Sequence, residues 1–88
     1  MSNEKPQLEF PCDYPIKVMG RTRDDFDQIV AEILQPHAPE VTTGDMDTRE
    51  SRNGNFVSVS VTIQATSYDQ LSAISQALRD SEHVVMSL

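Results

Sequence analysis

The sequence predicts an α+β domain in which two helices cover one face of a four-stranded antiparallel sheet. Three observations indicate this arrangement. The pair Asn53-Gly54 is a hairpin signal. The segment after it, residues 57–66, alternates apolar and polar side chains, as a strand buried on one face does. Two other segments repeat apolar residues at helical spacing, so the order of elements is strand, helix, strand, strand, helix, strand.

The chain of 88 residues is long enough for one hydrophobic core. We expect residues 1–12 to form an N-terminal tail or extended arm, with Leu8 and Phe10 docked on the domain edge, and residues 13–88 to form a single domain. No apolar stretch approaches the roughly 18 residues that cross a bilayer, and the N-terminus has no signal-peptide apolar region. The sequence therefore predicts a cytoplasmic protein without a membrane partner.

The first strand and helix are predicted from alternation followed by helical spacing. Apolar side chains alternate from Tyr14 to Val18, and this strand ends at Gly20. Thr22 is the expected N-cap of the helix, and Pro36 should end the helix within a residue or two because proline has no amide donor. The apolar stripe of this helix is Phe26, Ile29, Val30, Ile33 and Leu34.

The second predicted strand is the polar arm of the hairpin, residues 41–52. A two-residue type I′ loop at Asn53-Gly54 pairs Arg52 with Asn55 and places Met46 and Thr48 on the core face. The other face of this arm then carries charged side chains, which is typical of an edge strand. The sequence at these positions is Asp45, Asp47 and Arg49.

The second helix and the last strand complete the pattern. Thr66 and Ser67 are both expected N-caps, with Gln70 placed for a capping box. Residues 83–88 read as a short terminal strand. Right-handed crossovers then favour a ferredoxin-like βαββαβ sandwich with strand order 4-1-3-2 and both helices on one face. The other face of the sheet stays open.

Three motifs carry a resemblance to a known family, and they cover nearly the whole chain. They are Tyr14-Pro15-Ile16-Lys17-Val18-Met19-Gly20, His37-Ala38-Pro39 and Gly54-Asn55-Phe56-Val57-Ser58-Val59-Ser60-Val61. In these segments the chain resembles the YbeD-like family of small bacterial proteins. The resemblance implies a ferredoxin-like fold similar to that of the ACT regulatory domains, which bind small effectors. It supplies no catalytic residues, because the biochemical role of the family is uncharacterised.

The turn from Gly20 to Arg23 is the first candidate site. It joins the first strand to the first helix, where ACT-type domains commonly receive effectors. The guanidinium groups of Arg21 and Arg23, with free amides at the helix start, suit a carboxylate or phosphate. Asp24 and Asp25 oppose this interpretation because they already occupy the positive end of the helix dipole. The alternative is that both arginines are solvated surface residues.

His37 at the exit of the first helix is the second candidate, as a ligand contact or as a cap of the last helical carbonyls. The spacing of Cys12, His37 and His83 matches no zinc motif. The sequence predicts neither a metal site nor another cofactor.

The net charge of −7 and the lack of an aromatic platform on the predicted sheet argue against nucleic acid as a partner. We expect a non-catalytic regulatory or adaptor module that contacts a partner protein or a small anionic effector. A homodimer paired through the terminal strand is an expected assembly. The alternative function is a small enzyme with a site at a subunit interface, for which the candidate residues are His37, His83, Arg21 and Arg23.

Overall fold

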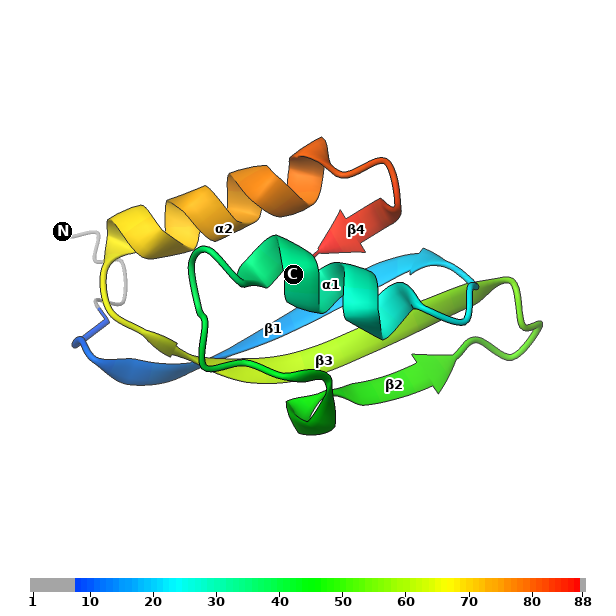
Figure 1. Ribbon diagram of the computed structural model, residues 1–88, viewed down its shortest axis with the longest axis horizontal. Coiled ribbons are helices and arrows are strands. Elements are labelled where there is room, and N and C mark those ends of the chain that lie inside the picture. Colours follow the sequence, from blue (N-terminus) through cyan, green and yellow to red (C-terminus); the bar gives the residue numbers. More distant parts are fainter. Residues whose placement is uncertain (1–7, 88) are drawn as a thin grey trace, which may run out of the picture.

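The computed structural model describes residues 8–87. It contains a four-stranded antiparallel sheet in the order β2-β3-β1-β4, with two helices (Figure 1). This is the predicted order 4-1-3-2 read in the opposite direction, and the predicted ferredoxin-like α+β fold is confirmed. The elements are β1 (Cys12–Arg21), α1 (Phe26–Leu34), the 3₁₀ turn η1 (Thr43–Asp45), β2 (Asp47–Glu50), β3 (Phe56–Ala65), α2 (Tyr68–Asp80) and β4 (Val84–Ser87).

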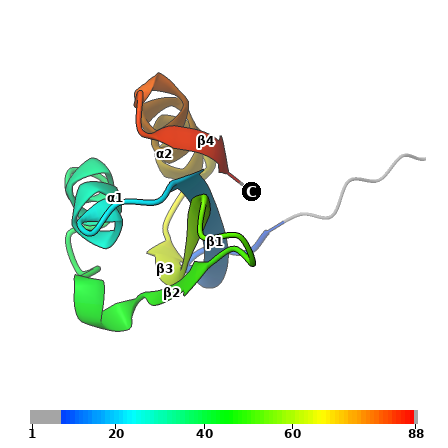
Figure 2. The same ribbon diagram turned by 90° about the vertical axis from the view of Figure 1, so that its right-hand side faces the viewer.

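Both helices lie on the same side of the sheet, and the core fills the space between the two layers (Figure 2). The alternation of β1 and β3 sends every second side chain into this space. Leu34 and Leu78 close it from α1 and α2, and both are almost fully buried. The sheet contributes Ile16, Val18, Val57, Val59, Val61 and Ile63 to the same cluster.

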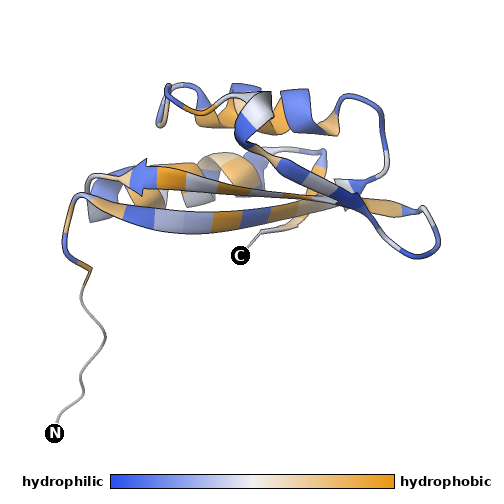
Figure 3. Cartoon of the chain, turned by 90° about the horizontal axis from the view of Figure 1, so that it is seen from below, coloured by the Kyte–Doolittle hydropathy of each residue, from blue (hydrophilic) through white to orange (hydrophobic). Residues whose placement is uncertain are grey.

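The pairing of the strands arranges the open face of the sheet in rows. β1 pairs with β3 and β3 with β2, so side chains from all three strands stand side by side. The bands of alternating hydropathy along the strands follow this arrangement (Figure 3). Two of the open-face rows are Lys17-Ser60-Asp47 and Met19-Ser58-Arg49, and Met86 of β4 extends the second row beyond Met19.

Pro15 lies in the middle of β1 without disrupting its ladder to β3. The Thr22 amide donates to the Asn55 carbonyl at 3.1 Å, which continues that ladder past the end of β1. The backbone N–H and C=O groups of successive residues in a strand point to opposite sides. Those of the even-numbered residues of β1 therefore point toward β3, and the nitrogen of Pro15 points away from it. Among the described residues, β4 pairs with Val18, Met19 and Gly20, so Pro15 lies on the stretch of β1 beyond these pairs. A groove of about 490 Å³ between β1 and α2 borders this stretch.

The hairpin has the predicted register but a wider loop. Thr48 pairs with Val59 as expected. The Ser51 amide donates to the Phe56 carbonyl at 2.8 Å, and the Gly54 amide donates to the Ser51 carbonyl at 2.9 Å. The loop therefore comprises residues 52–55, and only Gly54 has a positive φ, of 75°. The predicted type I′ turn is wrong because it requires positive φ at Asn53 as well.

We expect Gly54→Val to lower the free energy of unfolding by about 1 to 2 kcal/mol, because a β-branched residue is strained at positive φ. A new Cβ at Gly54 would meet no atom within 4 Å, so backbone strain is the only source of the loss. Chemical denaturation measures it. Asn53→Ala is the matched control, since Asn53 has a negative φ. Equal stabilities of the two variants would contradict the assigned turn.

β2 is shorter than the predicted arm because the 3₁₀ turn Thr43–Asp45 precedes it. The Asp45 carboxylate accepts hydrogen bonds from both the amide and the hydroxyl of Thr42, which holds this turn in a capping box. Met46 follows and packs against the core as expected. Thr48 lies on the predicted side of the sheet but remains exposed, because α1 packs on β3 and η1, and α2 packs on β3 and β4.

The start of α1 differs from the prediction. Thr22 does not cap the helix, because the ladder with β3 continues through Thr22 and α1 begins only at Phe26. The N-cap residue is Asp25, and its side chain makes no capping hydrogen bond. Instead the Asp25 carboxylate binds Arg23.

Gln70 connects the end of α1 to the start of α2. The helix α1 ends at Leu34, close to Pro36 as predicted, and the Leu34 carbonyl accepts from the next turn. Ser67 is the N-cap of α2 and accepts from the Gln70 amide at 3.0 Å. The Gln70 side chain then donates to the His37 carbonyl at 2.8 Å and accepts from the Thr66 amide at 2.8 Å.

The N-terminal arm docks at the start of α2, where the Phe10 ring packs edge-on against Tyr68 with centroids 4.8 Å apart. The Leu8 amide donates to the Tyr68 hydroxyl at 3.0 Å. The arm therefore lies on the domain edge, as expected.

Candidate functional site

Gly20, the first residue of the predicted anion site, is buried against the core. A Cβ atom at this position would lie within 3.0 Å of both the His83 carbonyl oxygen and the Phe26 ring. The glycine thus lets β1, α1 and the segment before β4 approach one another. Gly20 is therefore needed for packing, and the other residues of the turn form its surface.

Arg21 and Arg23 surround a small hollow where β1 ends. The hollow has a volume of about 240 Å³, and Glu82, His83 and Val85 form its other side. The Arg21 guanidinium lies over the Phe56 ring, 5.8 Å from its centroid. Arg21 and Arg23, the two cations of the predicted site, do share this hollow. His83, which the sequence offered only as a candidate for the alternative enzyme, lies 60 positions further along the chain than Arg23 and adjoins the same hollow.

Arg23 is held by two partners. Its Nε donates to Asp25 Oδ1 at 2.6 Å, and its Nη1 lies 3.2 Å from His83 Nδ1. Because arginine is always a donor, Nδ1 accepts and the proton of the neutral His83 ring lies on Nε2. That Nε2 is 3.8 Å from Glu82 Oε2. Asp25 therefore already balances much of the Arg23 charge, and the neutral His83 ring lies between Arg23 and Glu82.

The Arg23 hydrogen bond lowers the pKa of Asp25 below its ordinary value of 3.8 and raises the pKa of Arg23. A carboxyl whose pKa is lowered by folding adds stability above that ordinary value and loses it as the pH falls through the folded value. Both side chains are about half exposed, with relative accessibilities of 44% and 55%, so solvent screening keeps the contribution small.

We expect Asp25→Asn to reduce the free energy of unfolding slightly at neutral pH, and the difference from the wild type to disappear as the pH falls below 3.8. Urea denaturation of both proteins across this range tests the expectation. Asp24→Asn makes the same change of charge one residue away and is the control. A difference that persists unchanged at low pH would show that the Asp25 carboxylate is not what stabilises the turn.

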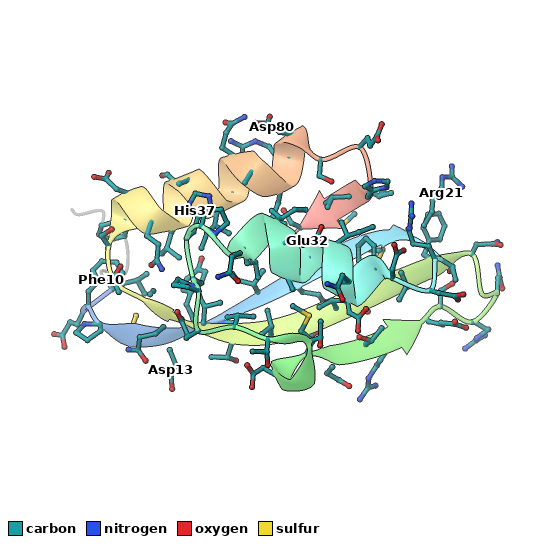
Figure 4. All side chains as sticks on the ribbon, viewed as in Figure 1. Phe10, Asp13, Arg21, Glu32, His37 and Asp80 are labelled. Atoms are coloured by element: carbon teal, nitrogen blue, oxygen red, sulfur yellow. The ribbon has the colours of Figure 1, made fainter. Side chains whose placement is uncertain are left out.

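His37 and Arg21 lie beyond opposite ends of α1 (Figure 4). Its backbone amide and that of Ala38 donate to the Leu34 carbonyl, so the backbone satisfies the helix end that its side chain was predicted to cap. Within residues 8–87, no three His, Cys, Asp or Glu side chains lie close enough to hold a metal ion. Within one copy of the chain, His37 therefore does not form a site with Arg21 and Arg23.

The open face of the sheet presents a second candidate surface. We call the set of Met19, Phe56, Ser58 and Met86 the open-face patch. Met86 pairs with Met19, and Met19 pairs with Ser58. Phe56 stands diagonally across from Met19 and lines the same small hollow. Met86 is 51% exposed, and the other three are half-buried.

The alternation of β1 and β3 places Met19, Phe56 and Ser58 on the open face, but sequence reasoning missed the patch. The missing information was the register of β4, which decides that Met86 adjoins Met19. A bulge at Met19 and Gly20 shifts this register, and simple alternation along residues 83–88 does not predict a bulge. Val84 consequently packs on the core, while Val85 is 57% exposed.

A family model described as "Protein of unknown function (DUF493)" matches residues 5–88. The chain belongs to this family. A UPF0250 protein from Ectopseudomonas mendocina is 48% identical over 86 residues, which cover 97% of this chain and 94% of that protein. A UPF0250 protein from Azotobacter vinelandii is 45% identical over 86 residues, with 97% and 94% covered. The predicted resemblance to a family of small uncharacterised bacterial proteins is confirmed.

The fold of the DUF493 chain is similar to a solved structure. The solution structure of protein HP0495 from H. pylori matches with a TM-score of 0.69 and 22% identity, covering 97% of this chain and 89% of that one. At this identity the likeness extends to the fold alone. Across residues 8–87, neither helix combines the length and the apolar character needed to cross a membrane.

Proposed function

We propose that this chain is a non-catalytic regulatory or adaptor module that acts by binding another protein at the open-face patch. The observation that carries the proposal is the exposure of Met86, which leaves 51% of its surface in solvent beside Met19. The core is already closed by the helices on the other face of the sheet, so folding does not require these side chains to be apolar. Contiguous apolar surface that folding leaves accessible is typical of interaction sites.

Crosslinking at the patch tests this function. A photoreactive amino acid replaces Met86 in cells that express the chain, and the same group replaces Ser72 on the exposed side of α2 as the control. We expect one discrete adduct from position 86 and none from position 72. The purified partner should then bind the wild-type chain and bind Met86→Ser more weakly. Equal affinity for both proteins would contradict binding at the patch.

A small anionic effector at the turn of Arg21 and Arg23 is the second candidate, favoured by the 240 Å³ hollow beside these residues. It has less support because Asp25 already pairs with Arg23. Titration with amino acids and small carboxylates, followed by amide NMR, distinguishes the candidates. Shifts centred on residues 20–23 favour the effector. Turnover of a compound favours the alternative of a small enzyme with a site at a subunit interface.

We expect two copies of the chain to pair through β4, because the strand lies at the edge of the sheet and exposes Val85. In the alternative, residues 8–11 cover this strand; the contacts of Leu8 and Phe10 with Tyr68 of α2 favour the pairing over that alternative. Analytical ultracentrifugation should detect a dimer that Val85→Lys converts to monomer. Ser72→Lys, on the exposed side of α2, is the control and should leave the dimer intact. A wild-type monomer at the highest soluble concentration would contradict the pairing.

A further inference from the structure

The groove of about 490 Å³ between α2 and β1 lies on the helical side of the sheet, away from the open-face patch. It exists because α2 has 13 residues and the strand that follows it, β4, has only 4. Among the described residues, β4 pairs with β1 at Val18, Met19 and Gly20. Figure 1 shows β4 beside the later part of α2 alone. The earlier part of α2 therefore passes β1 with no strand between them in residues 8–87.

The floor of this groove is apolar. Ile16 of β1 and Ile74 and Leu78 of α2 are buried at its base, and Tyr14 and Leu71 line it as half-buried side chains. These residues belong to the core or pack against it, so the floor is held in place by the fold. The groove therefore presents an apolar ligand with a surface that is ordered before the ligand binds.

The outer wall of the groove is polar and has a single charge. It is a stripe of exposed α2 side chains at helical spacing, namely Tyr68, Ser72, Ser75, Gln76 and Arg79. Within residues 8–87, Arg79 is the one charged residue that lines the groove, and no acidic residue does. The hollow beside Arg21 includes Glu82, and those on the open face include Asp45, Asp47 and Glu50. The groove thus favours an anion where these hollows do not.

The guanidinium of Arg79 has a neutral partner. Its Nη2 donates to Gln76 Oε1 at 2.9 Å, and the Gln76 amide donates to Asp80 Oδ1 at 2.8 Å. A neutral amide thus lies between this cation and the acid next to it in sequence, and most guanidinium donors remain for a ligand. Ser75 lies four residues before Arg79, so its hydroxyl adjoins the guanidinium on the same face of α2. A planar carboxylate suits such a group of donors.

We propose that the groove between α2 and β1 binds a small elongated carboxylate, with its apolar chain over Ile16 and Ile74 and its carboxylate on Arg79. The volume lies within the range of about 300–1,000 Å³ that is usual for small-molecule sites. The stripe from Tyr68 to Arg79 is about 16 Å long at the usual rise of a helix, which suits a narrow chain. An extended peptide that pairs with β1 fits less well, because Pro15 has no amide to donate at this edge.

Straight-chain carboxylates from hexanoate to dodecanoate test the proposal with the isotopically labelled full chain, each below its micellar concentration. We expect amide and methyl shifts at residues 14–16 and 68–79. The affinity should rise up to about fourfold for each added methylene, the size expected for a buried methylene group, and stop rising once the chain fills the groove. The alcohol of the same length should bind more weakly than each carboxylate, because it lacks the charge that pairs with Arg79.

Matched variants separate charge from apolar contact. Arg79→Gln should weaken the carboxylates up to about fivefold, the size expected for an exposed ion pair, and leave the alcohols unchanged. Arg52→Gln removes a cation from the hairpin loop and should change neither affinity. Ser75→Phe places a ring in the groove from an exposed position and should weaken both kinds of ligand. Gln28→Phe, at an exposed position of α1 outside the groove, is its control.

Each other outcome overturns the proposal. Equal affinity for the carboxylate and the alcohol, or an unchanged affinity in Arg79→Gln, contradicts a carboxylate on Arg79. Shifts spread over the surface with an affinity that never stops rising indicate nonspecific adsorption, and shifts at residues 20–23 place the anion at the turn instead. A change in sedimentation of Ser75→Phe without ligand shows that a second copy occupies the groove. The inference does not rest on the open-face patch, which the crosslinking at position 86 tests independently.

Discussion

We expect Phe26→Ala to lower the free energy of unfolding by about 3 to 5 kcal/mol, the usual range for a buried phenylalanine. Phe26 is 1% exposed and is the largest of the fully buried side chains. It begins α1, and its ring fills the space above Gly20 where the helix, β1 and the segment before β4 meet. The cavity left by alanine cannot close without moving backbone. Urea denaturation, followed by circular dichroism, measures the loss.

Phe10→Ala is the matched control for this prediction. Phe10 packs edge-on against Tyr68 but is only half-buried, so we expect a loss of about 1 kcal/mol, close to the value of one aromatic pair. If Phe10→Ala destabilised the chain as much as Phe26→Ala, the arm would be part of the folding core. The placement of the core at the start of α1 would then be wrong.

The sheet was predictable because the alternation of apolar and polar residues that indicates a strand is a local, periodic pattern. The alternation of residues 57–66 sets which side chains of β3 are buried, and a slip by one residue would expose Val59 and Val61. The register of the hairpin was correct for the same reason, although the loop was not. The observed turn uses one residue with positive φ, and Gly54 alone satisfies it. Asn53-Gly54 therefore marks a hairpin without fixing its turn type.

The start of α1 was not predictable from local capping preferences. Thr22 is a good N-cap by residue type, but the partner of its amide is Asn55, which only the pairing of β1 with β3 brings close. Arg23 likewise contacts His83 through the neighbouring position of β4. Contacts between residues so distant in the chain depend on the assembled fold. Sequence reasoning thus found the two arginines of the candidate site but not the contact of Arg23 with His83.

The arrangement of charge on the open face was equally hidden in the sequence. The cations are scattered along the chain, and no segment is basic. The period of β1 places Lys17 and Arg21 on the open face, and the register of β2 adds Arg49. A net charge of −7 does not say how the charge is distributed, and on this face Asp13, Asp45 and Asp47 match the three cations.

We expect Gly20→Ala to lower the free energy of unfolding by about 3 kcal/mol, at the upper end of the range for overpacked cores. The added Cβ would lie within 3.0 Å of the His83 carbonyl oxygen and of the Phe26 ring. A ring can turn to relieve such a contact. The carbonyl oxygen is backbone, however, and it precedes the strand β4 that pairs with β1 at this point. Thermal and chemical denaturation measure the loss.

Gly44→Ala is the control, because a Cβ there would meet Thr42 Oγ1 at 3.6 Å, an ordinary contact, and we expect little change. A double-mutant cycle with Phe26→Leu then divides the clash into its two parts. If the ring were the main obstacle, the smaller leucine would recover most of the stability that Gly20→Ala loses. We expect only partial recovery, since the His83 carbonyl remains. Full recovery would contradict a close approach of backbone to backbone, and no loss in Gly20→Ala would contradict the packing of β4 against β1.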